Sequence, residues 1–145
     1  MRTTAGVLLI VGLLAGCAGT AAGEAGEAVS TSASAAPVAE CTQAPQALLD
    51  RIATGALDGT GMVPLTGQVY LSPDYGKVYF VAMRFTATGV EDQTGVWATN
   101  GLDSGITMSV DVFAKEFTDW PDASTTDAAI ASTDPAVAVA IGCLG

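Results

Sequence analysis

The sequence contains no histidine among its 145 residues. Histidine is the commonest general base and metal ligand near neutral pH, so its absence excludes Ser–His–Asp and Cys–His catalysis. A serine–lysine pair would need Lys77 or Lys115, and neither lysine has a recognisable spacing to a serine. We therefore predict a chain with no catalytic residue and no cofactor, which is not an enzyme.

Basic residues are also scarce, because the chain has five lysines and arginines against fifteen aspartates and glutamates. All fifteen acidic residues but only four of the basic ones follow Cys17, so the chain beyond that cysteine carries a net charge of −11. Nucleic-acid binding depends on lysines and arginines that face phosphates. The charge therefore predicts no nucleic-acid partner. It favours a solvated surface or, as the sharper alternative, attraction of cations or a basic partner.

A long hydrophobic run is absent as well. The apolar stretch at residues 5–14 is shorter than the roughly 20 residues that a membrane-spanning helix needs. Arg2 precedes this stretch and Leu-Ala-Gly-Cys ends it at Cys17, a combination that resembles the signal of bacterial lipoproteins. The segment is therefore expected to be a processed export signal.

The resemblance to lipoproteins implies a cell location. It implies that residues 1–16 are a signal peptide and that Cys17 receives lipid, which would hold the protein on the extracytoplasmic face of the cell membrane. The membrane is then a partner through the lipid on Cys17. The alternative is ordinary cleavage near Ala15 or Ala18, which would release a soluble protein.

Composition changes sharply after the lipoprotein motif. Residues 17–40 consist almost entirely of Ala, Gly, Ser, Thr and Glu and contain no aromatic residue. Such a segment buries too little apolar surface to offset the entropy of ordering it, so the sequence predicts a disordered tether there. Residues 41–145 are then sufficient for a single small domain.

Cysteine usage agrees with export. If Cys17 is lipidated, Cys41 and Cys143 are the only thiols left, and an export signal places them in an oxidising compartment. We therefore predict a disulfide between them. The alternative is two free or intermolecular thiols.

Hydrophobic periodicity predicts an α+β fold: an antiparallel four-stranded meander packed with an N-terminal helix and one or two short C-terminal helices. The strand at residues 77–87 is apolar on both faces, which is typical of a central strand covered on both sides. Turn-forming residues 73–76 join it to the strand before it, and residues 100–104 join the last two strands. The expected elements are a helix at 44–57, strands at 68–72, 77–87, 95–99 and 105–110, a helix from Asp111 ended by Pro121, and a helix or strand at 137–141.

Two tryptophan-containing stretches carry a second resemblance. Residues 95–100 (GVWATN) and 114–121 (AKEFTDWP) are similar to a pattern in small secreted or lipid-anchored actinobacterial proteins. The resemblance covers about residues 79–143. It implies a family with no assigned activity, so it adds no mechanism.

Acidic loops supply the only candidate metal ligands. Calcium takes hard oxygen ligands from Asp, Glu, Asn and backbone carbonyls, and two loops offer a few of them. Neither loop matches the twelve-residue EF-hand spacing, so a solvated turn is the simpler interpretation. The candidates are Glu91 and Asp92 in one loop and Asn100 and Asp103 in the other.

Aromatic residues supply a candidate binding face. Trp97 lies opposite in parity to Val96 and Ala98, so it is either buried in the core or exposed as a contact residue. If Trp97 is exposed beside Tyr70 or Tyr79, these three residues would form a binding face. Trp120 is expected in the core.

Three function classes remain. The favoured class is a membrane-tethered module that binds a partner protein, a peptide or an envelope component without catalysis. The first alternative is a small carboxylate-based enzyme acting on envelope polymers. The second is a transporter-associated lipoprotein, although a two-lobed capture protein needs more chain than residues 41–145 provide.

The lipid anchor makes a direct prediction. The mature protein should begin at Cys17 and carry the added mass of its acyl chains, and Cys17→Ser should move it from the membrane fraction to the soluble fraction. Mass spectrometry and fractionation measure both. A mature protein without lipid mass on Cys17 would contradict the lipoprotein interpretation.

Overall fold

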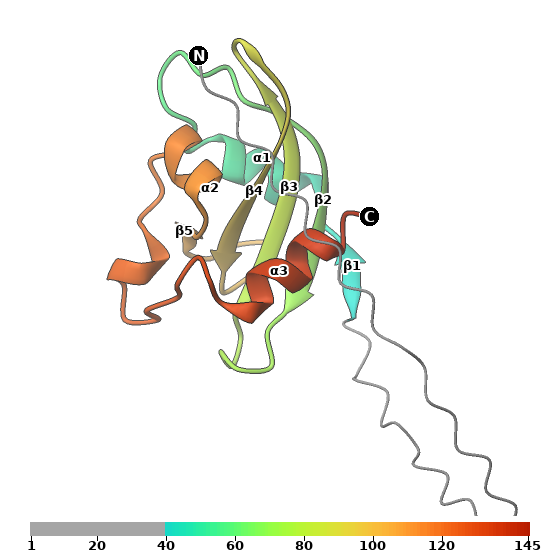
Figure 1. Ribbon diagram of the computed structural model, residues 1–145, viewed down its shortest axis with the longest axis vertical. Helices are drawn as coiled ribbons and strands as arrows, with labels where there is room; N and C mark the ends of the chain where they lie inside the picture. Colours follow the sequence, from blue (N-terminus) through green and yellow to red (C-terminus); the bar gives the residue numbers. More distant parts are fainter. Residues whose placement is uncertain (1–39) are drawn as a thin grey trace, which may run out of the picture. The chain divides into compact units, whose positions relative to one another are not determined.

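Figure 1 shows a computed structural model that describes residues 40–145. The predicted signal peptide, Cys17 and residues 18–39 of the predicted tether lie outside the described residues. The described part is α+β, and none of its helices is long and apolar enough to cross a membrane. In chain order the elements are β1 (Cys41–Gln43), α1 (Gln46–Ala53), β2 (Val63–Leu71), β3 (Tyr79–Ala87), β4 (Val90–Thr99), β5 (Thr107–Ser109), α2 (Val112–Phe117), the 3-10 turn η1 (Ala123–Thr125) and α3 (Pro135–Gly142).

The strands form one antiparallel sheet in the order β1-β2-β3-β4-β5, which confirms the predicted meander. The prediction of four strands was wrong, because β1 adds a fifth. Three residues are too few to show alternation, and β1 is defined by its pairing, in which Thr42 lies opposite Val69 of β2. Strands β2 and β4 also begin earlier than predicted, at Val63 and Val90.

The central strand β3 is buried on both faces, as its sequence predicts. Val81, Met83 and Phe85 belong to the apolar cluster on the face covered by α1. Phe80 and Ala82 belong to the cluster on the opposite face, which α3 covers. Figure 1 shows α3 on one side of the sheet and α1 on the other. Two separate cores therefore share β3 as their common wall.

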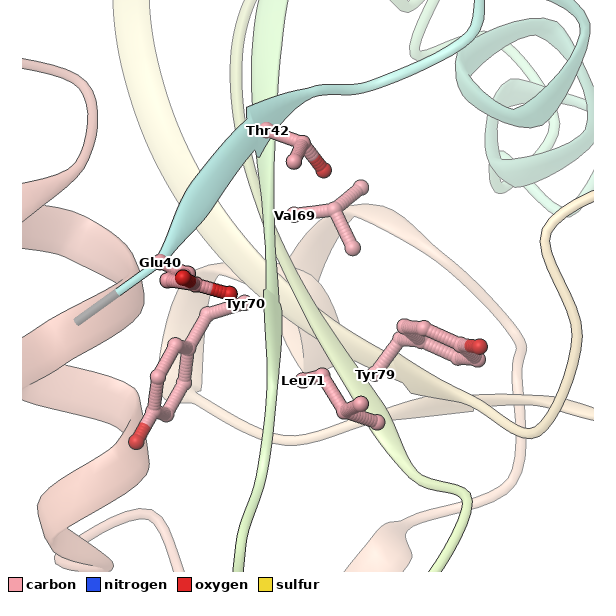
Figure 2. Close-up of a pocket in the computed structure, with 6 residues that line it drawn as sticks. All are labelled: Glu40, Thr42, Val69, Tyr70, Leu71 and Tyr79. Carbon is pink, nitrogen blue, oxygen red and sulfur yellow. The ribbon is translucent and has the colours of Figure 1, made fainter.

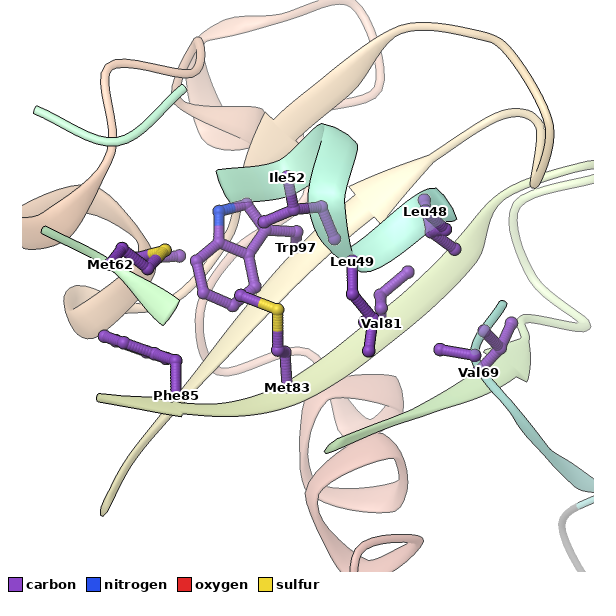
Figure 3. Close-up of a cluster of buried hydrophobic side chains, with 11 residues drawn as sticks. Leu48, Leu49, Ile52, Met62, Val69, Val81, Met83, Phe85 and Trp97 are labelled. Atoms are coloured by element: carbon purple, nitrogen blue, oxygen red, sulfur yellow. The ribbon is translucent and has the colours of Figure 1, made fainter. Parts of the chain in front are cut away.

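The α1-side cluster contains the largest buried side chain, Trp97 (Figure 3). Its indole nitrogen donates a hydrogen bond of 3.2 Å to the Thr118 hydroxyl, so the polar edge of the ring is satisfied inside the core. Phe85 meets Trp97 edge-on, with ring centroids 6.0 Å apart. Figure 3 shows α1 lying above this group.

Helix α1 is shorter than the predicted helix at residues 44–57. It starts after Pro45 and ends at Ala53 because the following residues make tertiary contacts instead of continuing the helix. Ala56 forms a β-bridge with Thr118, and the Leu57 amide donates to the Phe117 carbonyl at 3.0 Å. Such long-range pairing leaves no periodic signal in the sequence.

Each of the two C-terminal helices begins at a capping aspartate, and Asp111 is the helix start that the sequence predicts. The Asp111 carboxylate accepts from the Ala114 amide at 2.8 Å at the start of α2, and the Asp134 carboxylate accepts from the Ala136 amide at 2.9 Å at the start of α3. The last segment is thus a helix, and the strand alternative was wrong. Helix α2 stops before Trp120, whose indole nitrogen donates to the Ile52 carbonyl at 2.9 Å.

The predicted disulfide is present. It joins Cys41 in β1 to Cys143 at the end of α3, with 5.8 Å between the Cα atoms and a sequence separation of 102. Closing a loop of about 100 residues stabilises the folded state by up to about 4.7 kcal/mol in the chain-entropy model. The bond therefore fastens the outer strand β1 to the helix that covers the second core.

Two glycines predict opposite responses to alanine. A Cβ at Gly95 would lie 2.6 Å from the Trp97 ring and 3.3 Å from the Ala114 amide nitrogen, so Gly95→Ala should lower the free energy of unfolding by about 1–3 kcal/mol. A Cβ at Gly142 would meet no atom within 4 Å, and Gly142→Ala in α3 should raise it by about 0.5–1 kcal/mol. Urea unfolding measures both, and equal effects would contradict the packing described here.

Candidate functional site

The expected aromatic face does not exist as a group of three residues. Trp97 is fully buried, so it cannot contribute to an exposed surface, and the exposed alternative for this residue was wrong. Tyr70 lies opposite Phe80, whereas Tyr79 lies opposite Leu71. Because opposed residues of an antiparallel pair share a face and neighbours alternate, the two tyrosines project from opposite faces of the sheet.

Both tyrosines nevertheless line one pocket, at the end of the sheet where β1, β2 and β3 run side by side (Figure 2). The pocket has a volume of about 310 Å³, and no residue of α1 lines it. It therefore lies on the part of the sheet that this helix leaves uncovered. We call it the β1–β3 pocket, and its lining residues are Glu40, Thr42, Val69, Tyr70, Leu71 and Tyr79.

The chemistry of the β1–β3 pocket is apolar with a polar rim. Val69 is buried in its floor, while Leu71 is 48% exposed and Tyr79 is half-buried. Thr42 and Tyr79 bring hydroxyl groups, and Glu40 brings the only formal charge among the lining residues. This arrangement suits an apolar group that is accompanied by hydrogen-bond donors or a positive charge.

A second apolar hollow lies beside β5, near the second core. Its volume is about 300 Å³, and it is lined by Ile106, which is 63% exposed, and by the buried Met108. The Thr126 hydroxyl faces the Met108 sulfur at 3.5 Å. Asn100, one of the candidate calcium ligands, lies at its edge.

The candidate calcium ligands are engaged elsewhere or isolated. Asp92 forms an ion pair with Arg84, and the Asn100 side-chain oxygen accepts from the Ile106 amide at 2.9 Å. Glu91 and Asp103 are exposed. Residues 40–145 contain no group of three or more acidic or cysteine side chains that could hold a metal ion. The structure therefore does not bring the proposed ligands together into a site.

Arg51 makes functional-site contacts that were not predicted from the sequence. Its guanidinium donates to the carbonyl oxygens of Gly101 at 2.8 Å and Leu102 at 3.3 Å, and to the Thr99 hydroxyl at 3.3 Å. It thereby ties α1 to the β4–β5 turn. Thr99 lies directly opposite Tyr79 in the sheet, so the Arg51 hydrogen bonds lie next to a residue that lines the β1–β3 pocket. A single arginine between the buried residues of a short helix was the only available signal.

The acidic groups with shifted pKa values serve structural contacts. The Arg84 guanidinium lowers the pKa of Asp92, and the Lys115 ammonium, 2.9 Å away, lowers the pKa of Asp122. Burial raises the pKa of Asp111 even though the Ala114 amide stabilises its charged form. None of these three carboxyls lines the β1–β3 pocket.

Comparison with known proteins gives no homologue from which to transfer a role. No protein-family model, no curated protein and no solved structure matches the chain.

Replacing Asp111 with asparagine should show the cost of its buried charge. Because burial raises its pKa, the folded protein binds this proton more tightly than the unfolded chain does. The wild type therefore loses stability as pH rises from the ordinary aspartate range through the raised pKa. Asparagine caps a helix as well as aspartate does, so Asp111→Asn should gain stability relative to the wild type between pH 3 and pH 7.

Urea unfolding at both pH values measures this difference. Asp111→Ala is the matched control, because it removes the cap together with the charge. Loss of the cap should lower the free energy of unfolding by about 1 kcal/mol. If the free energy of unfolding of the asparagine variant falls relative to that of the wild type as pH rises, the charged form of Asp111 is stabilising. The pKa shift would then have the opposite sign.

Proposed function

We propose that this protein is a lipoprotein of the extracytoplasmic membrane face, anchored through Cys17, and that its described domain is a non-catalytic binding module. Two features of the chain support the location. The Leu-Ala-Gly-Cys motif follows an apolar segment too short to span a bilayer. The Cys41–Cys143 disulfide fits an oxidising compartment outside the cytoplasm.

The binding site of this module is the β1–β3 pocket. The observation that carries the proposal is the exposure of Leu71 beside Tyr79, at a sheet end that α1 leaves open. Exposed apolar residues that border a concave surface and adjoin a polar rim are typical of ligand and partner sites. The pocket also adjoins Glu40, the first described residue after the anchor-bearing segment.

The use of the charged groups supports binding without catalysis. The chain has no histidine, and its carboxyls with shifted pKa values are engaged by Arg84, by Lys115 or by the amide that begins α2. A carboxylate acid–base pair needs two such groups facing one cavity. Glu40 is the single carboxyl lining the β1–β3 pocket.

Site-specific photo-crosslinking on intact cells tests the assignment of the site. A benzophenone amino acid in place of Leu71 should give a crosslinked product, and Tyr79→Ala in the same chain should reduce that product by about tenfold because it removes the ring beside the probe. The matched control carries the probe at Val112, which is 65% exposed but lies on α2.

Circular dichroism and membrane fractionation would show that each variant folds and stays anchored. Equal products from the two probe positions, or a Leu71 product unaffected by Tyr79→Ala, would remove the β1–β3 pocket from the proposal.

A further inference from the structure

The sheet has free edges, and most of them are protected against pairing with another chain. At β5, the Ser109 amide donates to the Pro121 carbonyl at 2.9 Å, so a neighbouring segment covers that edge. The first half of β2 contains Pro64, which has no amide hydrogen, and a bulge follows it. The first half of β4 carries the exposed acids Glu91 and Asp92. Prolines, bulges, charges and covering loops are the usual means of blocking an edge.

The outer edge of β1 lacks these devices. The Ala44 amide donates to the Gly67 carbonyl at 3.0 Å, and the register places Thr42 opposite Val69. Because hydrogen-bonded and non-bonded pairs alternate along an antiparallel ladder, the amide and carbonyl groups of Cys41 and Gln43 point away from β2. All three residues of β1 are exposed, and no described residue pairs with this edge.

We propose that the outer edge of β1 is a strand-addition site that takes an extended, basic segment of a partner protein. The inference names a partner class for the proposed binding module and rests on that proposed function. In strand addition, main-chain hydrogen bonds give affinity and pockets for alternate side chains give specificity. The free main-chain groups of Cys41 and Gln43 would make the hydrogen bonds, and the β1–β3 pocket would receive the side chains.

Charge selects a basic segment over a second copy of this chain. Residues 40–145 contain thirteen acidic and four basic residues, a net charge of −9. Arg84 and Lys115 are engaged in ion pairs, and the Arg51 guanidinium is bound to backbone carbonyls. Glu40 immediately precedes β1 and lines the β1–β3 pocket. Two copies of so acidic a domain repel each other, whereas lysines or arginines on a partner strand are attracted.

The pocket explains which side chains the added strand should carry. Side chains of a strand alternate between faces, so every second residue of the partner would lie on the same face as Thr42, Leu71 and Tyr79. Apolar residues suit these positions, and basic residues suit the positions between them. The disulfide holds β1 against α3, so the edge is preformed and binding need not order it.

A synthetic peptide tests strand addition directly. The probe is fluorescein-labelled Lys-Val-Lys-Val-Lys-Val-Lys, titrated against the mature, lipidated chain in neutral detergent and followed by fluorescence anisotropy. Two further versions carry N-methyl groups on the valines or on the lysines, because alternate amides of a strand face one edge. We expect one methylated version to bind about tenfold more weakly and the other to bind like the parent peptide. Equal binding of all three peptides would overturn the proposal, since attraction by charge alone needs no main-chain donor.

Substitution at Gln43 gives the matched protein test. Gln43→Pro removes one outward amide hydrogen and is compatible with an edge strand, whereas Gln43→Thr keeps the hydrogen. The proline variant should bind the parent peptide about tenfold more weakly, and the threonine variant should bind it unchanged. Circular dichroism and thiol counting verify that both variants fold with the disulfide closed. Unchanged binding by a folded proline variant would overturn the proposal.

Hydrogen exchange identifies the occupant of the edge. The Cys41 and Gln43 amides should become protected when the peptide is added. Protection of the same amides on concentrating the protein alone would overturn the proposal in favour of a second copy. If the peptide fails but the Leu71 probe still crosslinks in a Tyr79-dependent manner, strand addition is lost while the proposed binding module stands.

Discussion

A strand that is apolar on both faces must be covered on both faces, and β3 imposes this requirement on the whole fold. Phe80 and Phe85 point to opposite sides of the sheet, and each is fully buried. Burying an aromatic side chain of this size contributes about 1.5–3 kcal/mol, so neither face can remain open at little cost. Helix α1 and the indole of Trp97 fill one side, and α3 fills the other. The remaining elements connect these two layers.

The disulfide holds the outer strand β1 in place at the edge of the sheet. Strand β1 has three residues, all exposed, and it pairs with β2 alone, which is too little contact to hold a strand by itself. Cys143 binds it covalently to the helix over the second core. The result is an outer strand that is rigid but uncovered. The β1–β3 pocket lies beside it because α1 covers another part of the same face.

Local sequence patterns predicted the elements that depend only on residues close together in the chain. The two-faced strand β3 and the helix start at Asp111 were predicted in this way, whereas the Cys41–Cys143 pairing was predicted from the cysteine count. Backbone features that depend on distant partners were not predicted. β1 exists through its register with β2, and α1 ends where Ala56 pairs with residue 118. The sequence predicted Tyr70 and Tyr79 as binding residues but did not predict the pocket. Alternation along a strand cannot show that two tyrosines from opposite faces line the same pocket.

The basic residues of the described domain are few, and most of them contact other parts of the domain. Four such residues occur in residues 40–145, and three of them have partners within the domain: Arg51 binds backbone carbonyls, Arg84 pairs with Asp92 and Lys115 pairs with Asp122. Thirteen acidic residues outnumber these four basic ones, so the domain has a net charge of −9 and a strongly acidic exterior. An acidic exterior disfavours anionic lipid and copies of itself. It also suits the proposed encounter with a basic partner at an edge whose main-chain groups are free.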